Sequence, residues 1–204
     1  MNKPFSAACE RNRDPILAVL KQYLDKGALL EIGAGTGQHA VYFAKEFPQL
    51  EWVCSDVQEN HAGIQAWMQE AKLPNLYGPK TLQIGKDDFP DKKPYQYVYS
   101  CNTLHIMSWK ENKTLFKLLG KRLREGALVF FYGPFNYEGQ YTSQSNKEFD
   151  QWLKHTHSHL SAIRNFEDVH TAMNKNGFKL LQDHQMPANN RLLVFERLAL
   201  IGKV

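Results

Sequence analysis

The feature that most constrains the fold is an alternation between short apolar runs and longer segments with helical spacing. Apolar runs occupy residues 28–32, 52–55, 97–100 and 127–132, and segments with apolar residues three or four positions apart lie between them. This alternation is typical of βαβ units, in which helices cover a mostly parallel sheet. The chain is therefore expected to adopt an α/β fold.

The helices and strands are bounded by Pro, Gly and capping residues. The last two strands follow each other directly, which favours an antiparallel last strand on an otherwise parallel sheet. We predict a Rossmann-like, seven-stranded, mostly parallel sheet with helices on both faces. The expected helices are 13–25, 38–46, 61–72, 110–124, 147–154 and 166–176, and the expected strands are 28–32, 52–55, 81–84, 97–100, 127–132, 179–185 and 191–198.

Length, charge and cysteine content restrict the class of protein. A length of 204 residues suits one domain, 1–204, with an amino-terminal helix or lid at 1–27 and a substrate-side insertion at 133–165. The net charge of +4, with no block of five like charges, argues against a nucleic-acid partner. No apolar stretch reaches the ~18 residues that span a membrane. Three cysteines without a CxxC pair favour a reducing compartment, so we expect a cytoplasmic location and no membrane partner. One sequence does not define the oligomeric state.

The strongest local signal is the run Glu31-Ile32-Gly33-Ala34-Gly35-Thr36-Gly37, between an expected strand and an expected helix. Glycines allow a tight turn and a close approach of a ligand to the backbone. The helix start presents unpaired N–H groups and a positive dipole end, which favour an anion such as an amino-acid carboxylate. Dinucleotide sites place a third glycine where this chain has Gln38.

An acid at 31 with glycines at 33, 35 and 37 resembles motif I of the class I methyltransferases. The resemblance implies that Gly33, Ala34, Gly35 and Gly37 cradle S-adenosyl-L-methionine and that Glu31 lies near its cationic amino group. Asp56, at the expected end of the second strand, suits a bidentate contact with the ribose hydroxyls.

An adenine contact is expected just after the third strand, among residues 85–88. We assign it to Asp87, although a turn or cap explains Asp87 and Asp88 equally well.

A wider set of segments carries a more specific resemblance. Together they resemble the methyltransferase-like protein 26 family, which implies a class I fold, S-adenosyl-L-methionine as cofactor and S-adenosyl-L-homocysteine as product, but no acceptor. The chain departs from the family at 155–162 and at Gln83-Ile84-Gly85. The matching segments are residues 8–16, 31–39, 55–57, 101–106 with Trp109, 132–135, 139, 142–143, 145–146, 149–150, 187–190 and 194–195.

Several polar and aromatic residues are expected at the carboxyl ends of the strands, where open α/β sheets bind ligands. We assign catalysis to Asn102, His105 and Tyr132, with Asn102 also near the cofactor. The family analogy places Arg11 beside the cofactor and Asn12 beside the substrate. The remaining substrate candidates are Phe135, Asn189 and Asn190.

Each assignment has a plainer alternative that the sequence leaves open. Asn102 can be a cap, His105 a packing histidine and Arg11 a partner for a surface carboxylate. Tyr132 and Phe135 can belong to the core, and Asn189-Asn190 is a plausible turn pair.

His155, His157 and His159 would converge only on a strand, and no cysteine or acid lies beside them, so no metal is expected. The predicted function is S-adenosyl-L-methionine-dependent methyl transfer to an unidentified small molecule. A protein methyltransferase and a catalytically silent cofactor-binding or interaction protein are the alternatives.

Overall fold

The structure is a computed structural model that describes residues 3–199. The chain divides into two compact units, the first ending at Tyr99 and the second beginning at Ser100. Within the described residues, no helix has both the length and the apolar character needed to cross a membrane.

The first unit is built on four parallel strands. These are β1 (Gly27–Ile32), β2 (Leu50–Asp56), β3 (Leu76–Thr81) and β4 (Tyr97–Cys101). β1 pairs with β2 on one side and with β4 on the other, and β2 pairs with β3. β1 and β2 are buried along almost their whole length, as expected for parallel strands covered on both faces.

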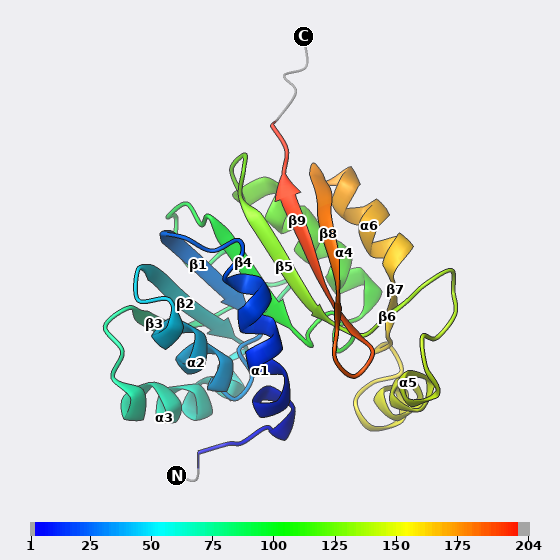
Figure 1. Cartoon of the computed structure of the whole chain (residues 1–204), viewed down its shortest axis with the longest axis horizontal. Coiled ribbons are helices and arrows are strands. Elements are labelled where there is room, and N and C mark those ends of the chain that lie inside the picture. Colours follow the sequence, from blue (N-terminus) through cyan, green and yellow to red (C-terminus); the bar gives the residue numbers. More distant parts are fainter. Residues whose placement is uncertain (1–2, 200–204) are drawn as a thin grey trace. The chain divides into compact units, whose positions relative to one another are not determined.

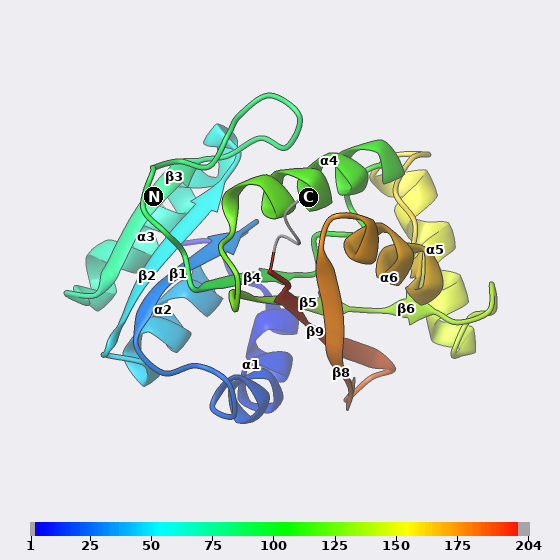
Figure 2. The ribbon, with the colours of Figure 1, turned by 90° about the horizontal axis from the view of Figure 1, so that it is seen from above.

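Three helices accompany these strands: α1 (Ala7–Leu20), α2 (Gln38–Glu46) and α3 (His61–Ala71), the last preceded by the short 3-10 helix η1 (Gln58–Asn60). Figures 1 and 2 both show α2 and α3 beside β2 and β3, with α1 next to α2. The predicted positions of α2 and α3 are confirmed within one residue.

The predicted start of the first helix is wrong. The helix was expected over 13–25, but α1 begins at Ala7, where the Ser6 side chain accepts a hydrogen bond from the Cys9 N–H. Pro15 lies inside the helix, which therefore lacks the hydrogen bond that the residue 15 N–H would donate.

The predicted third strand is also displaced. The expected strand at 81–84 is wrong, since β3 ends at Thr81. Its sequence contains Gly78 and Pro79, and only Leu76 is buried, so it lacks the apolar signal of a central strand. β3 is an edge strand, and proline is tolerated there.

The second unit contains an antiparallel set of strands, β5 (Leu128–Gly133), β8 (Phe178–Met186) and β9 (Asn190–Arg197). β9 runs antiparallel to both of its neighbours. In sheet order the strands are β3-β2-β1-β4-β5-β9-β8. The predicted seven-stranded, mostly parallel sheet with an antiparallel last strand is thus confirmed.

The helices of the second unit are α4 (Trp109–Arg122), α5 (Gln144–Thr156) and α6 (Phe166–Lys175). Figure 2 shows α6 alongside β8. Ser108 and Glu111 form a capping box at the start of α4. A short parallel pair, β6 (Phe135–Asn136) with β7 (Arg164–Asn165), was not predicted, because two-residue strands leave no periodic signal.

Candidate functional site

The glycine loop between β1 and α2 is shaped by its backbone. The N–H groups of Gly33 and Ala34 donate to the Ser55 carbonyl at 3.0 and 3.1 Å. Gly37 has a φ of 88°, and a Cβ there would lie 3.0 Å from the Ile64 Cα, so α2 packs closely on α3. Gly35 differs, because a Cβ on it would meet no heavy atom within 4 Å. Its φ of 58° disfavours a side chain, and its outer face is open to a ligand.

Asp56, at the end of β2, already holds this loop. Its Oδ2 accepts from the Gly35 N–H at 2.6 Å, and its Oδ1 accepts from the Val57 N–H at 2.7 Å and from Asn60 Nδ2 at 2.9 Å. A carboxylate has about four lone-pair sites. A bidentate contact with two ribose hydroxyls therefore requires Asp56 to release one of its present donors.

Glu31 lies in β1 and is 2% exposed. Its carboxylate accepts a hydrogen bond from Trp52 Nε1 at 2.6 Å. Burial raises the pKa of Glu31 to about 8, against the opposing effect of the Trp52 hydrogen bond. At neutral pH this acid is therefore largely protonated, and a cationic group placed beside it would favour the carboxylate.

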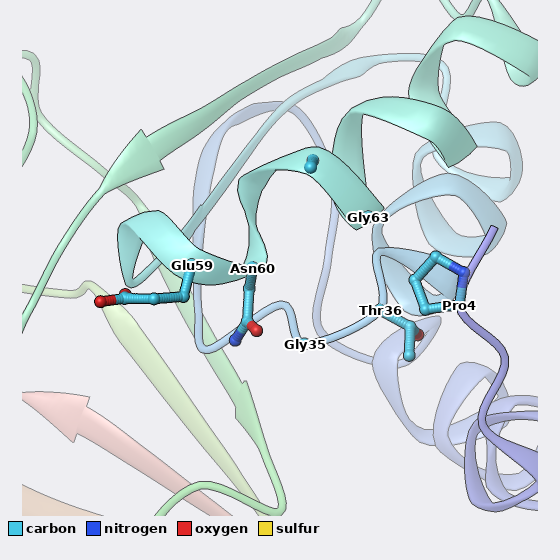
Figure 3. Close-up of a pocket in the computed structure, with 7 residues that line it drawn as sticks. Pro4, Gly35, Thr36, Glu59, Asn60 and Gly63 are labelled. Carbon is cyan, nitrogen blue, oxygen red and sulfur yellow. The ribbon is translucent and has the colours of Figure 1, made fainter. Parts of the chain in front are cut away.

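A cavity of about 600 Å³ borders the loop. Figure 3 shows the Asn60 side chain extending toward the loop at Gly35, whereas Glu59 points away from it. The cavity thus adjoins the open face of Gly35. Its lining residues are Pro4, Gly35, Thr36, Glu59, Asn60, Ala62 and Gly63.

Gln38, the first residue of α2, forms several hydrogen bonds through its side-chain amide. Its Oε1 accepts from the Ser6 N–H at 2.5 Å and from the Thr36 hydroxyl at 3.0 Å. Its Nε2 donates to Glu10 Oε1 at 3.0 Å and to the Ser6 carbonyl at 3.4 Å. One buried amide therefore ties the start of α1 to the start of α2, which the sequence did not reveal.

The two amino-terminal candidates have different surroundings. Arg11 is exposed, whereas Asn12 is buried with its Oδ1 2.8 Å from His39 Nε2. Burial lowers the pKa of His39 to about 4, so its ring is neutral, with Nε2 donating to Asn12 and Nδ1 3.3 Å from the Tyr99 hydroxyl. Asn12 thus joins α1 to α2, and the ligand roles of both candidates stay predictions.

The choice of Asp87 rested on the misplaced third strand. Asp87 is exposed, and its Oδ2 accepts from the Gln83 N–H at 2.7 Å, which is a local turn contact. The residue that follows β3 is Leu82, whose N–H donates to the Asp56 carbonyl at 3.0 Å. Leu82 and Gln83 therefore occupy the position after the strand for which residues 85–88 were considered.

In the second unit, the catalytic candidates converge on Gly133 at the end of β5. A Cβ on Gly133 would lie 3.5 Å from His105 Nδ1 and 3.6 Å from Asn102 Oδ1. Asn102 has a φ of 55°, and its N–H donates to the Tyr132 carbonyl at 2.8 Å. Tyr132 itself is buried. Asn102 and His105 therefore present polar atoms to one small space.

His105 combines burial with unused polar atoms. It is 4% exposed, and its ring packs edge-on against Phe149. Among residues 3–199, no group forms a hydrogen bond with either ring nitrogen of His105. Burial, followed by the charges of Arg164 and His157, lowers the pKa of His105 to about 4. The ring is therefore neutral at physiological pH, with one nitrogen as a hydrogen-bond donor and the other as an acceptor.

The loop that carries His105 is fixed by side chains that the sequence did not single out as site residues. Arg164 donates to the carbonyls of Leu104, Met107 and Leu160. The Ala162 N–H donates to the His105 carbonyl at 3.0 Å. This set of backbone contacts holds the imidazole in place.

The substrate candidates of the second unit are divided between core and surface. Phe135 is 2% exposed and belongs to the core. Asn190 Nδ2 donates to the carbonyls of Pro187 and Ala188, which supports the turn interpretation. Asn189 and Asn190 also help to line a second cavity, of about 360 Å³, together with Tyr137, Thr142, Gln185 and Arg191.

His155, His157 and His159 are exposed at and beyond the end of α5. Within the described part of the chain, no cluster of three His, Cys, Asp or Glu residues could hold a metal ion.

The strand order, the antiparallel last strands and the glycine loop after β1 together define the class I methyltransferase fold. A family model described as a protein of unknown function (DUF938) matches residues 3–197. The chain therefore belongs to the DUF938 family.

Solved methyltransferases share this fold. The S-adenosylmethionine-dependent methyltransferase SibL in its apo form aligns with a TM-score of 0.79 at 19% identity, over 95% of this chain and 56% of that one. An O-methyltransferase family 2 protein from Planctomyces limnophilus in complex with apigenin gives 0.73 at 13%, over 91% and 62%. Human N-acetylserotonin methyltransferase in complex with SAM gives 0.73 at 12%, over 94% and 58%. The chain thus spans less than two thirds of each of these proteins.

Proposed function

We propose that this protein is a methyltransferase that uses S-adenosyl-L-methionine and acts on a small molecule. The observation that carries the proposal is the open face of Gly35, a side-chain-free position at the mouth of a cavity and hydrogen-bonded to the carboxylate of Asp56. Gly85, Gly126 and Gly139 also have open space at the Cβ position, so it is the combination with the cavity and with Asp56 that sets Gly35 apart.

The residues of the first unit fit this cofactor. Gly33, Ala34, Gly35 and Gly37 would form the cradle, and Asp56 would accept hydrogen bonds from the ribose hydroxyls. Glu31 would ionise opposite the ammonium group of the methionine part. Leu82 and Gln83, which follow β3, join Asp87 as candidates for the adenine contact. Arg11 and Asn102 are further candidate contacts.

The cofactor, when bound, supplies a methyl group on a positively charged sulfur and leaves as S-adenosyl-L-homocysteine. His105 would accept the proton from the attacking hydroxyl of the acceptor, and the neutral state of its ring is the state that this role requires. Asn102 Oδ1 would orient the same hydroxyl as a hydrogen-bond acceptor. Holding the acceptor in position can account for about 7–11 kcal/mol of the barrier.

Two independent likenesses support the proposal. The motifs that resemble the methyltransferase-like protein 26 family extend over nearly the whole chain, so we place the protein near that family. The structure solved with apigenin is a relative in complex with a small aromatic molecule, which favours a small-molecule acceptor here. The three cysteines, free in the structure, support a cytoplasmic location.

Isothermal titration with S-adenosyl-L-methionine, with NAD as the comparison ligand, tests the cofactor. We expect saturable one-to-one binding of the methyl donor and none of NAD. Tight NAD binding, or no binding of either ligand, would refute the proposal.

Incubation with a cell extract and methyl-labelled cofactor then tests the reaction. Label in a low-molecular-mass product supports a small-molecule methyltransferase. Label in protein identifies a protein methyltransferase, and cofactor binding without any transfer identifies a catalytically silent binding protein.

A further inference from the structure

The second cavity is lined by two residues, Gln185 and Arg191, that align with Gly133 across the strands. Gly133 in β5 is directly opposite Arg191 in β9, and Arg191 is directly opposite Gln185 in β8. Directly opposed residues of antiparallel strands project to the same face of the sheet. The cavity lined by Arg191 and Gln185 is therefore one ladder position away from Gly133, where Asn102 and His105 meet.

The guanidinium of Arg191 is oriented by hydrogen bonds to Asp183. Asp183 Oδ1 accepts from Arg191 Nε at 2.6 Å, and the Asp183 carbonyl accepts from Arg191 Nη2 at 3.2 Å. Asp183 Oδ2 accepts from the Tyr137 hydroxyl at 2.6 Å. Asp183 thus engages Nε and Nη2 of Arg191, and Tyr137 also lies close enough to interact with the guanidinium.

The lining of this cavity is rich in hydrogen-bond donors. It contains one guanidinium, side-chain amides from Gln185 and Asn189, and the hydroxyl of Thr142. The cavity has no acidic lining residue in the described part of the chain. An oriented guanidinium surrounded by amides and hydroxyls is a setting that suits a carboxylate or a phosphate.

We propose that this cavity binds the anionic group of the methyl acceptor, a carboxylate or phosphate held by Arg191, with Gln185 and Asn189 as neighbouring donors. The claim that the bound anion is part of the methyl acceptor rests on the proposed function, whereas the claim that the cavity binds an anion does not. Gly133 and Arg191 are opposed in the ladder, so an acceptor that reached both places would carry a hydroxyl and an anionic group. The proposed acceptor is therefore a hydroxylated acid.

The probes are hydroxybenzoates and hydroxyphenyl phosphates, each compared with its neutral amide or methyl ether. Their binding is followed at millimolar concentration by the side-chain amide resonances of Gln185 and Asn189 in ¹⁵N-labelled protein. We expect the anionic member of a pair to bind at least about tenfold more tightly than the neutral one.

The informative variant is Arg191→Gln combined with Asp183→Asn, because removal of Arg191 alone would leave an unpaired carboxylate. We expect the preference for anions to disappear in it. The matched control is Lys179→Gln with Glu196→Gln, which removes an ion pair of 3.0 Å between the same two strands, at positions farther along β8 and β9. The control should keep the preference.

Three outcomes would overturn the proposal. Neutral and anionic probes bind equally well, or the anion preference survives in the Arg191 and Asp183 double variant. The third is that no anionic probe moves these resonances. Titration of S-adenosyl-L-methionine into the same samples separates the two claims. Loss of anion binding with intact cofactor binding defeats only the acceptor assignment, and the reverse result defeats only the methyltransferase assignment.

Discussion

The two units differ in whether the polar side chains of their candidate sites are hydrogen-bonded within the protein. Beside the glycine loop of the first unit, Asp56 and Gln38 are bonded within the protein, Asp56 to three donors and Gln38 to four groups. In the second unit, the ring nitrogens of His105 have no such partner among the described residues. The first unit thus contains a platform, the glycine loop with Asp56 and Gln38, whose polar groups are bonded within the protein, whereas His105 keeps its ring nitrogens unpaired.

The largest expected effect comes from His105→Gln, which tests whether the unpaired imidazole acts on the acceptor. Loss of a general base typically costs about 10²–10⁴-fold in rate. We expect turnover to fall by that factor while the Kd for S-adenosyl-L-methionine stays unchanged. Since the pKa of His105 is about 4, kcat of the wild type should not fall between pH 5.5 and pH 8 because of this group.

The matched control is His170→Gln in α6, a partly exposed histidine whose ring stacks on Phe166. It should leave both turnover and affinity unchanged. An equal loss of turnover and cofactor affinity in His105→Gln would instead assign His105 to the scaffold.

Gly35→Ala tests the open face of the platform. The methyl group would occupy the space that we assign to the cofactor, and the left-handed backbone adds about 1–2 kcal/mol of strain. We expect the Kd for S-adenosyl-L-methionine to rise by roughly thirtyfold or more, measured by isothermal titration.

Gly139→Ala provides the comparison, because Gly139 also has a positive φ, 72°, and a Cβ on it would likewise meet no heavy atom within 4 Å. It carries similar strain outside the glycine loop, so the Kd for S-adenosyl-L-methionine should stay unchanged. If both variants keep wild-type affinity, Gly35 does not contact the cofactor.

Asp56→Asn tests how strongly cofactor affinity depends on the Asp56 carboxylate. An amide cannot accept hydrogen bonds at both of its heavy atoms, so Asp56→Asn loses either the contact to Gly35 or those to Val57 and Asn60. We expect affinity for the cofactor to fall by more than about tenfold. Asn60→Ala removes a single donor and should have a smaller effect. Unchanged affinity in Asp56→Asn would contradict the ribose assignment.

The smallest effect concerns proton release by Glu31. With a pKa of about 8, Glu31 is mostly protonated at pH 7, and a bound ammonium group would ionise it. Cofactor binding at pH 7 should therefore release about one proton, and affinity should rise with pH by up to about tenfold per unit below pH 8. Titrations in buffers of different ionisation enthalpy measure this release, which should vanish in Glu31→Gln.

The sequence predicted the platform because its signal is local. We identified the glycine spacing, Glu31 and Asp56 from their places in an expected succession of strand, turn and helix. The structure has these elements where they were expected. β3 was misplaced because Gly78 and Pro79 obscure an exposed edge strand. Gln38 was taken only as a missing glycine, since its partners in α1 lie about thirty positions earlier in the chain.

The second unit was harder to predict because its cluster depends on register between distant strands. His105 and Asn102 were chosen for their place after a strand, and they do lie together at Gly133. Arg191 was not chosen, because its alignment with Gly133 and Gln185 arises only when β9 pairs with β5 and β8. The contact of Asp183 with Tyr137 likewise joins residues 46 positions apart.

The hydrogen bonds of the Gln38 amide make residues 6–10 part of the structure around the glycine loop. Because this amide bonds both the N–H and the carbonyl of Ser6, the residue that caps α1 is a structural component of the glycine-loop platform. A deletion that begins the chain after Glu10 would remove these contacts and is expected to loosen the start of α2.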